Sequence, residues 1–184
     1  QKVFDIPIIG VIDPGAKAAV SSTKNATIGV IGTEGTINSG AYQRKIRRML
    51  PSAEIIGISC PLFVPIVEEG WESTDVAYIT AQRYLLELKE HNVDSLVLGC
   101  THYPALRYTI DKVLGDKVTL INPAYEAAKA AKIMLKEQNL LSQKLDGGNC
   151  NFYVSDDPEK FKRIGGNILR KEIASVQKVN IENL

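Results

Sequence analysis

A thiol, a hydroxyl and an imidazole follow one another in the middle of the chain, in the segment GCTHYP (99–104). The apolar run SLVL (95–98) precedes this segment, and its proline can open a helix, so Cys100, Thr101 and His102 are expected where a strand gives way to a helix. In an open parallel α/β sheet, ligands bind at that edge. The positive end of a helix that starts near Pro104 would favour the thiolate of Cys100. This cysteine is therefore a candidate nucleophile or proton carrier.

The same residues also allow a purely structural interpretation. Free cysteine is among the most frequently buried residue types, so Cys100 can simply end a strand, with His102 as a surface histidine. Taken alone, the segment does not decide between the two readings.

Four segments resemble, in order, parts of the cofactor-independent glutamate racemases in the aspartate/glutamate racemase superfamily. LVLGCTHYPAL (96–106) resembles the second cysteine motif of that family, and PIIGVIDPG (7–15) resembles the segment after its first cysteine. IGVIGTEGTINSGAYQRKI (28–46) resembles its glycine/threonine loop, and CPLFVPIVEEGW (60–71) the segment that carries its acidic residue. A looser likeness at FYVSDDPEKF (152–161) extends the resemblance over nearly the whole chain.

This resemblance implies an isomerase that interconverts L- and D-glutamate and supplies D-glutamate for peptidoglycan. Family members use two cysteines, one on each face of the substrate Cα, and no pyridoxal phosphate. Cys100 matches the second cysteine, His102 the histidine that assists it, and Glu68 the family's acidic residue. Glu68 has an alternative reading, since two adjacent acids before a glycine are often a solvated loop. Aspartate or another small acid is the alternative substrate, and the histidine after Cys-Thr favours glutamate.

Carboxylate binding needs hydroxyls, backbone N–H groups or helix N-termini. Thr101, beside Cys100, is the best candidate, and His102 lies next to it. Thr33 and Thr36, in the loop GTEGT, follow a second strand end of similar sequence and are further candidates. That loop also resembles a phosphate cradle, but it lacks the Lys-Ser/Thr ending of a P-loop, so nucleotide binding is not expected.

The family's Asp-Ser-Gly strand end, its Tyr-Gly loop and its Cys-Asn-Thr motif have no counterpart in this sequence. The chain begins at Gln1, and we expect it to represent the C-terminal two-thirds of a racemase that lacks the part with the first catalytic cysteine. The chain as given is then expected to be inactive. A competing hypothesis of another class is a non-catalytic fragment that binds a small dicarboxylate.

Composition limits the partners. Twenty-two Lys and Arg balance 21 Asp and Glu, for a net charge of +1, so there is no basic field for nucleic acid or an anionic membrane. No metal site is indicated, because no Cys-x-x-Cys pair or histidine cluster occurs. The three free cysteines favour a reducing cytoplasm. Cys60 is expected to be packed and Cys150 incidental. Glutamate is the expected partner, with a homodimer as a further option and no cofactor.

Short β-branched runs alternate with helix-period segments, which predicts an α/β fold with a parallel sheet. The expected strands are Ile8–Ile12, Thr27–Ile31, Glu54–Ser59, Ser95–Leu98 and Val118–Ile121, then weaker ones near 151–154 and 175–181. The expected helices are Ala16–Ser21, Ser39–Met49, Ser73–Lys89, Pro104–Leu114, Pro123–Gln138 and a segment near 158–168. Polar residues 140–149 read as a linker.

The family consists of two similar parallel-sheet α/β domains that face each other across a cleft. By analogy, residues 17–121 are expected to form one complete domain. Residues 1–16 and 122–184 would then be the remaining part of the second domain, which is incomplete here.

Overall fold

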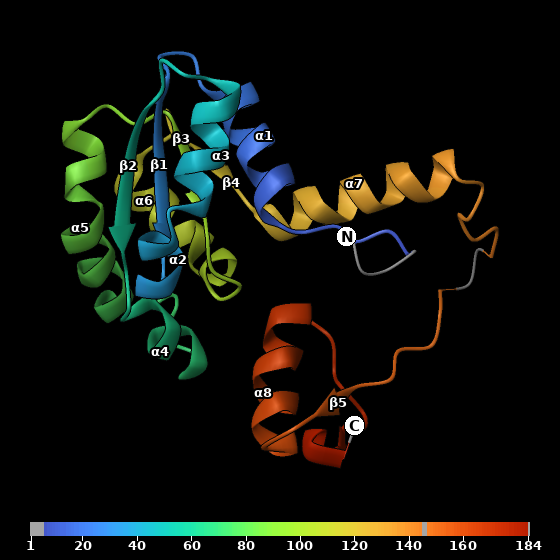
Figure 1. Cartoon of the computed structure of the whole chain (residues 1–184). Coiled ribbons are helices and arrows are strands. Elements are labelled where there is room, and N and C mark those ends of the chain that lie inside the picture. The colour runs from blue at the N-terminus through green and yellow to red at the C-terminus, as the bar shows by residue number, and fades with distance from the viewer. Residues whose placement is uncertain (1–5, 145–146, 184) are drawn as a thin grey trace. The chain divides into compact units, whose positions relative to one another are not determined.

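Four parallel strands form the central sheet of the computed structural model, which describes residues 6–144 and 147–183 (Figure 1). The strands are β1 (Thr27–Gly32), β2 (Glu54–Ser59), β3 (Ser95–Leu98) and β4 (Thr119–Ile121), in the spatial order β2-β1-β3-β4. β1 pairs along its whole length with β2 and also pairs with β3. All four strands therefore end at the same edge of the sheet, and the α/β prediction is confirmed.

Helices cover both faces of this sheet. One face packs against α1 (Ile12–Ser22) and α3 (Ala41–Met49), and α7 (Pro123–Glu137) packs on α1. The other face carries α4 (Phe63–Glu68), α5 (Asp75–Glu90), the 3-10 turn η1 (Tyr103–Leu106) and α6 (Arg107–Leu114). α2 (Glu34–Ser39) follows β1.

The sheet has a hydrophobic core on each face because successive strand residues point to opposite sides. Ile28 and Val30 belong to the core under α1 and α3, whereas Ile31 belongs to the core under α5. Every residue of β1 and β3 is buried. This explains why both strands read as nearly continuous apolar runs in the sequence.

Side chains cap the N-termini of the two longest helices, α5 and α7. Thr74 caps α5 by accepting a hydrogen bond from Ala77 N, with Asp75 in the first turn. Asn122 caps α7 in the same way, and Pro123 occupies the first helical position. Between α2 and α3, Gly40 has a φ of +61°, a conformation that glycine adopts at little cost.

Several predicted elements differ from the structure. The predicted strand Ile8–Ile12 is wrong: residues 8–11 form no strand, and α1 begins at Ile12. Ile8 and Val11 are about half exposed, so this run lacks the neighbouring strand that a parallel strand needs. Two six-residue helices, α2 and α4, were not predicted. The segment from Pro104 opens with a 3-10 turn, and its α-helix starts only at Arg107.

The chain divides into two compact units, residues 1–141 and 142–184. The second unit contains β5 (Tyr153–Val154), α8 (Pro158–Leu169), β6 (Gln177–Lys178) and η2 (Ile181–Asn183), and β5 and β6 pair in parallel. The boundary falls in the predicted linker, whose described residues have no helix or strand and whose residues 145–146 lie outside the described range. The division at residues 17–121 remains a prediction.

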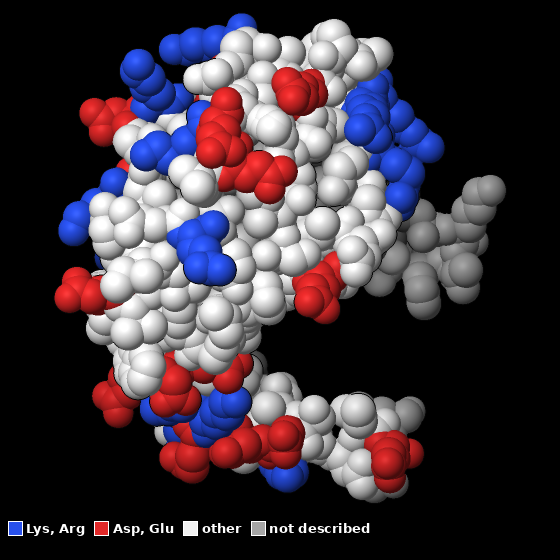
Figure 2. Space-filling view, turned by 90° about the vertical axis from the view of Figure 1, so that its left-hand side faces the viewer, with Lys and Arg blue, Asp and Glu red and all other residues white. Residues whose placement is uncertain are grey.

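Charged side chains of both signs lie side by side on the face shown in Figure 2. Within the described part of the chain, no helix has the length and apolar character that crossing a bilayer requires.

Candidate functional site

Cys100, Thr101 and His102 lie in a tight turn at the carboxyl end of β3. Gly99 N donates a hydrogen bond to Ile31 O of β1 at 2.7 Å, which keeps the turn at the sheet edge. Tyr103 N then donates to Cys100 O at 3.2 Å and starts η1. This is the strand-end position that the sequence predicts for the three polar side chains.

His102 lies between the thiol and a carboxylate. Its Nδ1 is 3.8 Å from Cys100 Sγ, and its Nε2 is 3.4 Å from Glu68 Oε1. The side chains of His102 and Glu68 are about a quarter exposed. Glu68 is the last residue of α4, so it is part of this cluster and not of a solvated loop. The order Cys-His-Glu allows the imidazole to take the thiol proton on one nitrogen while the carboxylate holds the other.

The imidazole, not an α-helix terminus, is the group that contacts the thiol. The predicted helix from Pro104 begins as a 3-10 turn, and α6 starts seven residues after Cys100. A helix dipole acts mainly within its own first turn. A helical segment does begin three residues after Cys100, at Tyr103, and the stabilisation of the Cys100 thiolate by this helix start remains a prediction.

Tyr103 connects the turn to the helix that carries Glu68. Its hydroxyl donates a hydrogen bond to Cys60 O at 2.8 Å, and its ring meets Phe63 edge-on, with centroids 5.3 Å apart. Phe63 is the first residue of α4, and Glu68 is the last. Burial, together with the nearby Cys60 and Cys100 thiols, raises the pKa of Tyr103, so its hydroxyl stays a donor. Sequence reasoning missed this residue, although it directly follows His102.

Cys60 is fully buried, as the sequence predicts for a packed residue. Burial raises the pKa of its thiol to about 12, which makes it a poor proton carrier near neutral pH. Cys150 is exposed and belongs to the second unit.

Thr33 and Thr36 have hydrogen-bond partners within the protein. Thr33 caps α2 by accepting from Thr36 N, and the two hydroxyl oxygens are 3.1 Å apart. Thr36 Oγ1 donates to Gly99 O at 3.3 Å. These threonines therefore tie the end of β1 to the end of β3, directly before Cys100, and a role in substrate binding remains a prediction. Thr101 Oγ1 lies 3.5 Å from His102 Nδ1.

A hollow of about 90 Å³ opens beside Cys100 and Thr101. Tyr42 of α3 and Asn122, the cap of α7, also line it. Sequence reasoning named neither of these two residues as part of the site. The only signal for Tyr42 was its position in the segment 28–46 that resembles the family's glycine/threonine loop.

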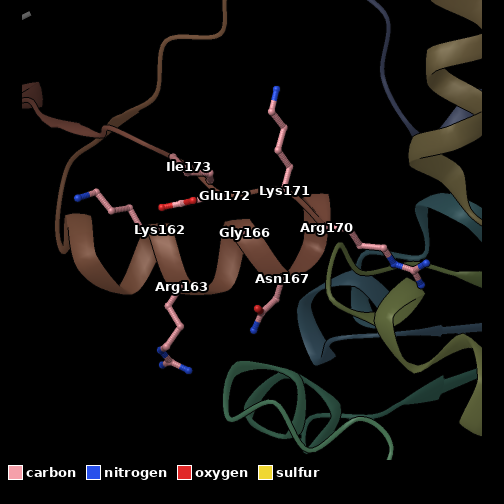
Figure 3. Close-up of a pocket in the computed structure, with 8 residues that line it drawn as sticks. All are labelled: Lys162, Arg163, Gly166, Asn167, Arg170, Lys171, Glu172 and Ile173. Carbon is pink, nitrogen blue, oxygen red and sulfur yellow. The ribbon is translucent and has the colours of Figure 1, made fainter.

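A larger hollow of about 490 Å³ in the second unit lies along α8 and is rich in cationic side chains. Figure 3 shows that Lys162, Arg163, Arg170 and Lys171 point in different directions from the helix and the segment that follows it. Because the four positive charges do not point toward a common position, these side chains do not form an anion-binding site. The described residues contain no group of His, Cys, Asp and Glu that could hold a metal ion.

Comparisons with known proteins show which proteins this chain resembles. The family model described as Asp/Glu/Hydantoin racemase matches residues 1–131. A glutamate racemase from Geobacter metallireducens is 44% identical over 182 residues, which are 99% of this chain and 67% of that protein. Glutamate racemase isoform RacE1 from Bacillus anthracis has a similar structure, with a TM-score of 0.91 and 36% identity over 98% of this chain and 67% of that one.

A second solved structure, glutamate racemase from Francisella tularensis in complex with D-glutamate, matches with a TM-score of 0.88 and 36% identity. The match covers 98% of this chain and 66% of that one. The chain thus spans about two thirds of the length of these relatives.

Proposed function

The chain belongs to the Asp/Glu/hydantoin racemase family, and on that premise we propose that it supplies one of the two proton carriers of a glutamate racemase, an isomerase that interconverts L- and D-glutamate. The observation that carries the proposal is the Cys100–His102–Glu68 cluster at the carboxyl edge of the sheet. This cluster holds a thiol next to a base at the place where open α/β sheets bind their ligands.

Racemisation requires that a proton leave Cα on one face and that another arrive on the opposite face. In the proposal, Cys100 Sγ is the proton carrier on one face. His102 Nδ1, 3.8 Å away, accepts the thiol proton and returns it, while Glu68 orients the ring and stabilises its protonated form. Contacts of this length in a structure without substrate commonly tighten when substrate binds. Thiol and imidazole chemistry of this kind needs no cofactor.

Glutamate is favoured over aspartate because the relatives at 39–44% identity are named glutamate racemases, and the Francisella protein was solved with D-glutamate. Thr101 is the proposed hydroxyl donor to a substrate carboxylate, with His102 beside it. Thr33 and Thr36 are proposed to support binding through the loop that they hold against Gly99.

In this proposal D-glutamate is made for peptidoglycan, in the cytoplasm. The free thiols Cys60, Cys100 and Cys150 support a reducing compartment. A homodimer stays a prediction, which sedimentation velocity would test. Leu62, Trp71 and Val76, which are about half exposed around a hollow of about 220 Å³, are the apolar residues to examine first.

Exchange of the Cα hydrogen for deuterium tests the role of Cys100, because it reports proton removal on one face even without inversion. Each enantiomer of glutamate is incubated separately with the protein in D2O, and exchange is followed by NMR. The enantiomer whose Cα–H faces Cys100 should exchange, and Cys100→Ser should slow that exchange at least a hundredfold, the usual contribution of general acid–base catalysis.

Cys150→Ser is the matched control, because that thiol is exposed in the second unit. It should leave the exchange rate unchanged. Equal exchange by wild type and Cys100→Ser would refute the proposed role of this thiol.

A further inference from the structure

Tyr42 is a buried phenol beside the reactive thiol. It lies on α3, 58 positions before Cys100, and is only 3% exposed. Its ring belongs to the core under α1 and α3, and the same residue lines the hollow next to Cys100 and Thr101. It is therefore a core residue that also borders the site.

The hydroxyl end of the Tyr42 ring reaches the strand edge. A methyl group added at Gly99 would meet Tyr42 Cε2 at 3.3 Å, and one added at Gly15 would meet Cε1 at 3.4 Å. These two carbons flank the carbon that bears the hydroxyl. The phenol oxygen is thus held between α1 and the end of β3, directly before Cys100, where glycines leave room for the ring.

Within the described part of the chain, the Tyr42 hydroxyl makes no hydrogen bond, and burial is the cause that raises its pKa to about 12. A phenol with that pKa remains protonated, and is a donor, at any physiological pH. The Tyr42 oxygen is not among the fully enclosed polar atoms that lack a partner in the described residues, so it is open to the hollow that Tyr42 lines. Tyr103 is the contrast, because its side chain is fully buried and its hydroxyl donates a hydrogen bond to Cys60 O.

The hollow beside Tyr42 offers hydrogen-bond donors and no charged side chain. Asn122 Oδ1 accepts a hydrogen bond from Ala124 N at 3.0 Å, so the group that Asn122 can offer to a ligand is the donor Nδ2. Thr101 adds a hydroxyl at the same hollow. An apolar wall with a few donors suits one oxygen-rich, acceptor-only group, and a carboxylate is such a group.

We propose that Tyr42 is a substrate-binding residue, whose hydroxyl donates a hydrogen bond to a carboxylate oxygen of the glutamate held beside Cys100. This inference rests on the proposed function, since it names a further contact of the same site. In this proposal the Tyr42 hydroxyl donates its hydrogen bond to the bound substrate, because it has no such bond within the described part of the protein. The packing of its ring between Gly15 and Gly99 sets the direction of the hydrogen bond.

Protection of Cys100 from alkylation measures this contact in the full 184-residue chain. Modification by iodoacetamide is followed by peptide mass spectrometry at increasing D-glutamate, which yields the concentration for half protection. Tyr42→Phe removes the hydroxyl and keeps the ring. It should raise the half-protecting concentration about tenfold, the effect expected for losing a hydrogen bond to a charged group.

Thermal unfolding separates a role in binding from a role in structure. Tyr42→Phe should leave the melting temperature equal to or above that of wild type, because no protein hydrogen bond is lost. Tyr103→Phe, the matched control, loses its bond to Cys60 O and should melt at a lower temperature. A drop for Tyr42→Phe as large as that for Tyr103→Phe would mean that Tyr42 has a structural partner, and would overturn the inference.

The remaining outcomes separate this inference from the proposed function. If wild type is protected and Tyr42→Phe is protected equally well, the role of Tyr42 is wrong and the proposed function stands. If D-glutamate does not protect Cys100 of the wild type at all, glutamate does not bind there, and both proposals fail.

Discussion

Alkylation rates of the three cysteines should show which thiol is the most reactive. The substitution His102→Asn tests whether the imidazole of His102 causes the reactivity of Cys100. Burial raises the pKa of Cys60 to about 12. At pH 7 about one Cys60 thiol in a hundred thousand is then ionised, against about three in a hundred for an ordinary cysteine with a pKa of about 8.5. Ionisation alone thus makes Cys60 about three-thousandfold less reactive than an ordinary thiol, and burial slows it further.

Cys100 should instead react first. It is partly exposed, and the His102 imidazole 3.8 Å from its sulfur can hold the thiol proton. In His102→Asn this partner is lost, so the rate at Cys100 should fall about tenfold, the effect of one hydrogen bond to a charged group. Cys150, exposed in the other unit, is the internal reference, and its rate should not change.

The assay is a time course with iodoacetamide at pH 7, read by peptide mass spectrometry. His91→Asn is the matched control, because His91 is exposed at the end of α5. It should leave all three rates unchanged. The reasoning is refuted if Cys60 or Cys150 is modified before Cys100, or if His102→Asn leaves the Cys100 rate as it was.

Three further outcomes are expected. Tyr103→Phe should unfold about 3 °C below wild type in a thermal scan, because the hydrogen bond to Cys60 O is lost. The loss is only about 1 kcal/mol, since Cys60 O still accepts a hydrogen bond from Phe63 N. An unchanged melting temperature would contradict this. Burial raises the pKa of Asp94, but three hydrogen bonds from residues 23–25 outweigh burial and hold that pKa below its usual value. The charged form therefore stabilises the fold above about pH 4, and this contribution disappears as the pH falls through the lowered pKa. Asp94→Asn should cost about 1 kcal/mol at pH 7, since the carboxylate is partly exposed, and chemical denaturation curves of the two proteins should converge toward pH 2; a constant difference would contradict the assignment. Finally, the 184-residue chain alone should not sustain inversion of L-glutamate in a circular dichroism assay, because Cys60 cannot supply a second thiol at neutral pH, and sustained turnover would disprove this.

Elements with a strong local signal could be predicted from the sequence. β2 and β3 begin and end at the predicted residues, and β1 extends the predicted strand by one residue. The apolar runs of β1 and β3 are buried on both faces of the sheet, whereas β2 lies at the edge of the sheet and is partly buried. The helix α7 also begins at the predicted residue, since Asn122 and Pro123 act within one turn of chain.

Predictions failed where an element depends on distant residues. The run Ile8–Ile12 has strand composition, but a strand needs a neighbour, and its described residues have none. The helix α4 has only six residues, too few for local propensity to stabilise it, and Phe63 anchors it against Tyr103 and Tyr84.

By itself, the sequence determined the family, the α/β class and the place of Cys100 and His102 at a strand end, because motifs and hydrophobic periods are local properties of the chain. Only the tertiary structure decided that Glu68 contacts His102 and that Tyr42 reaches the hollow beside Cys100. Each of these facts joins residues more than thirty positions apart, or depends on burial by a distant element. Such contacts arise from the packing of helices on both faces of the sheet, which no local pattern specifies.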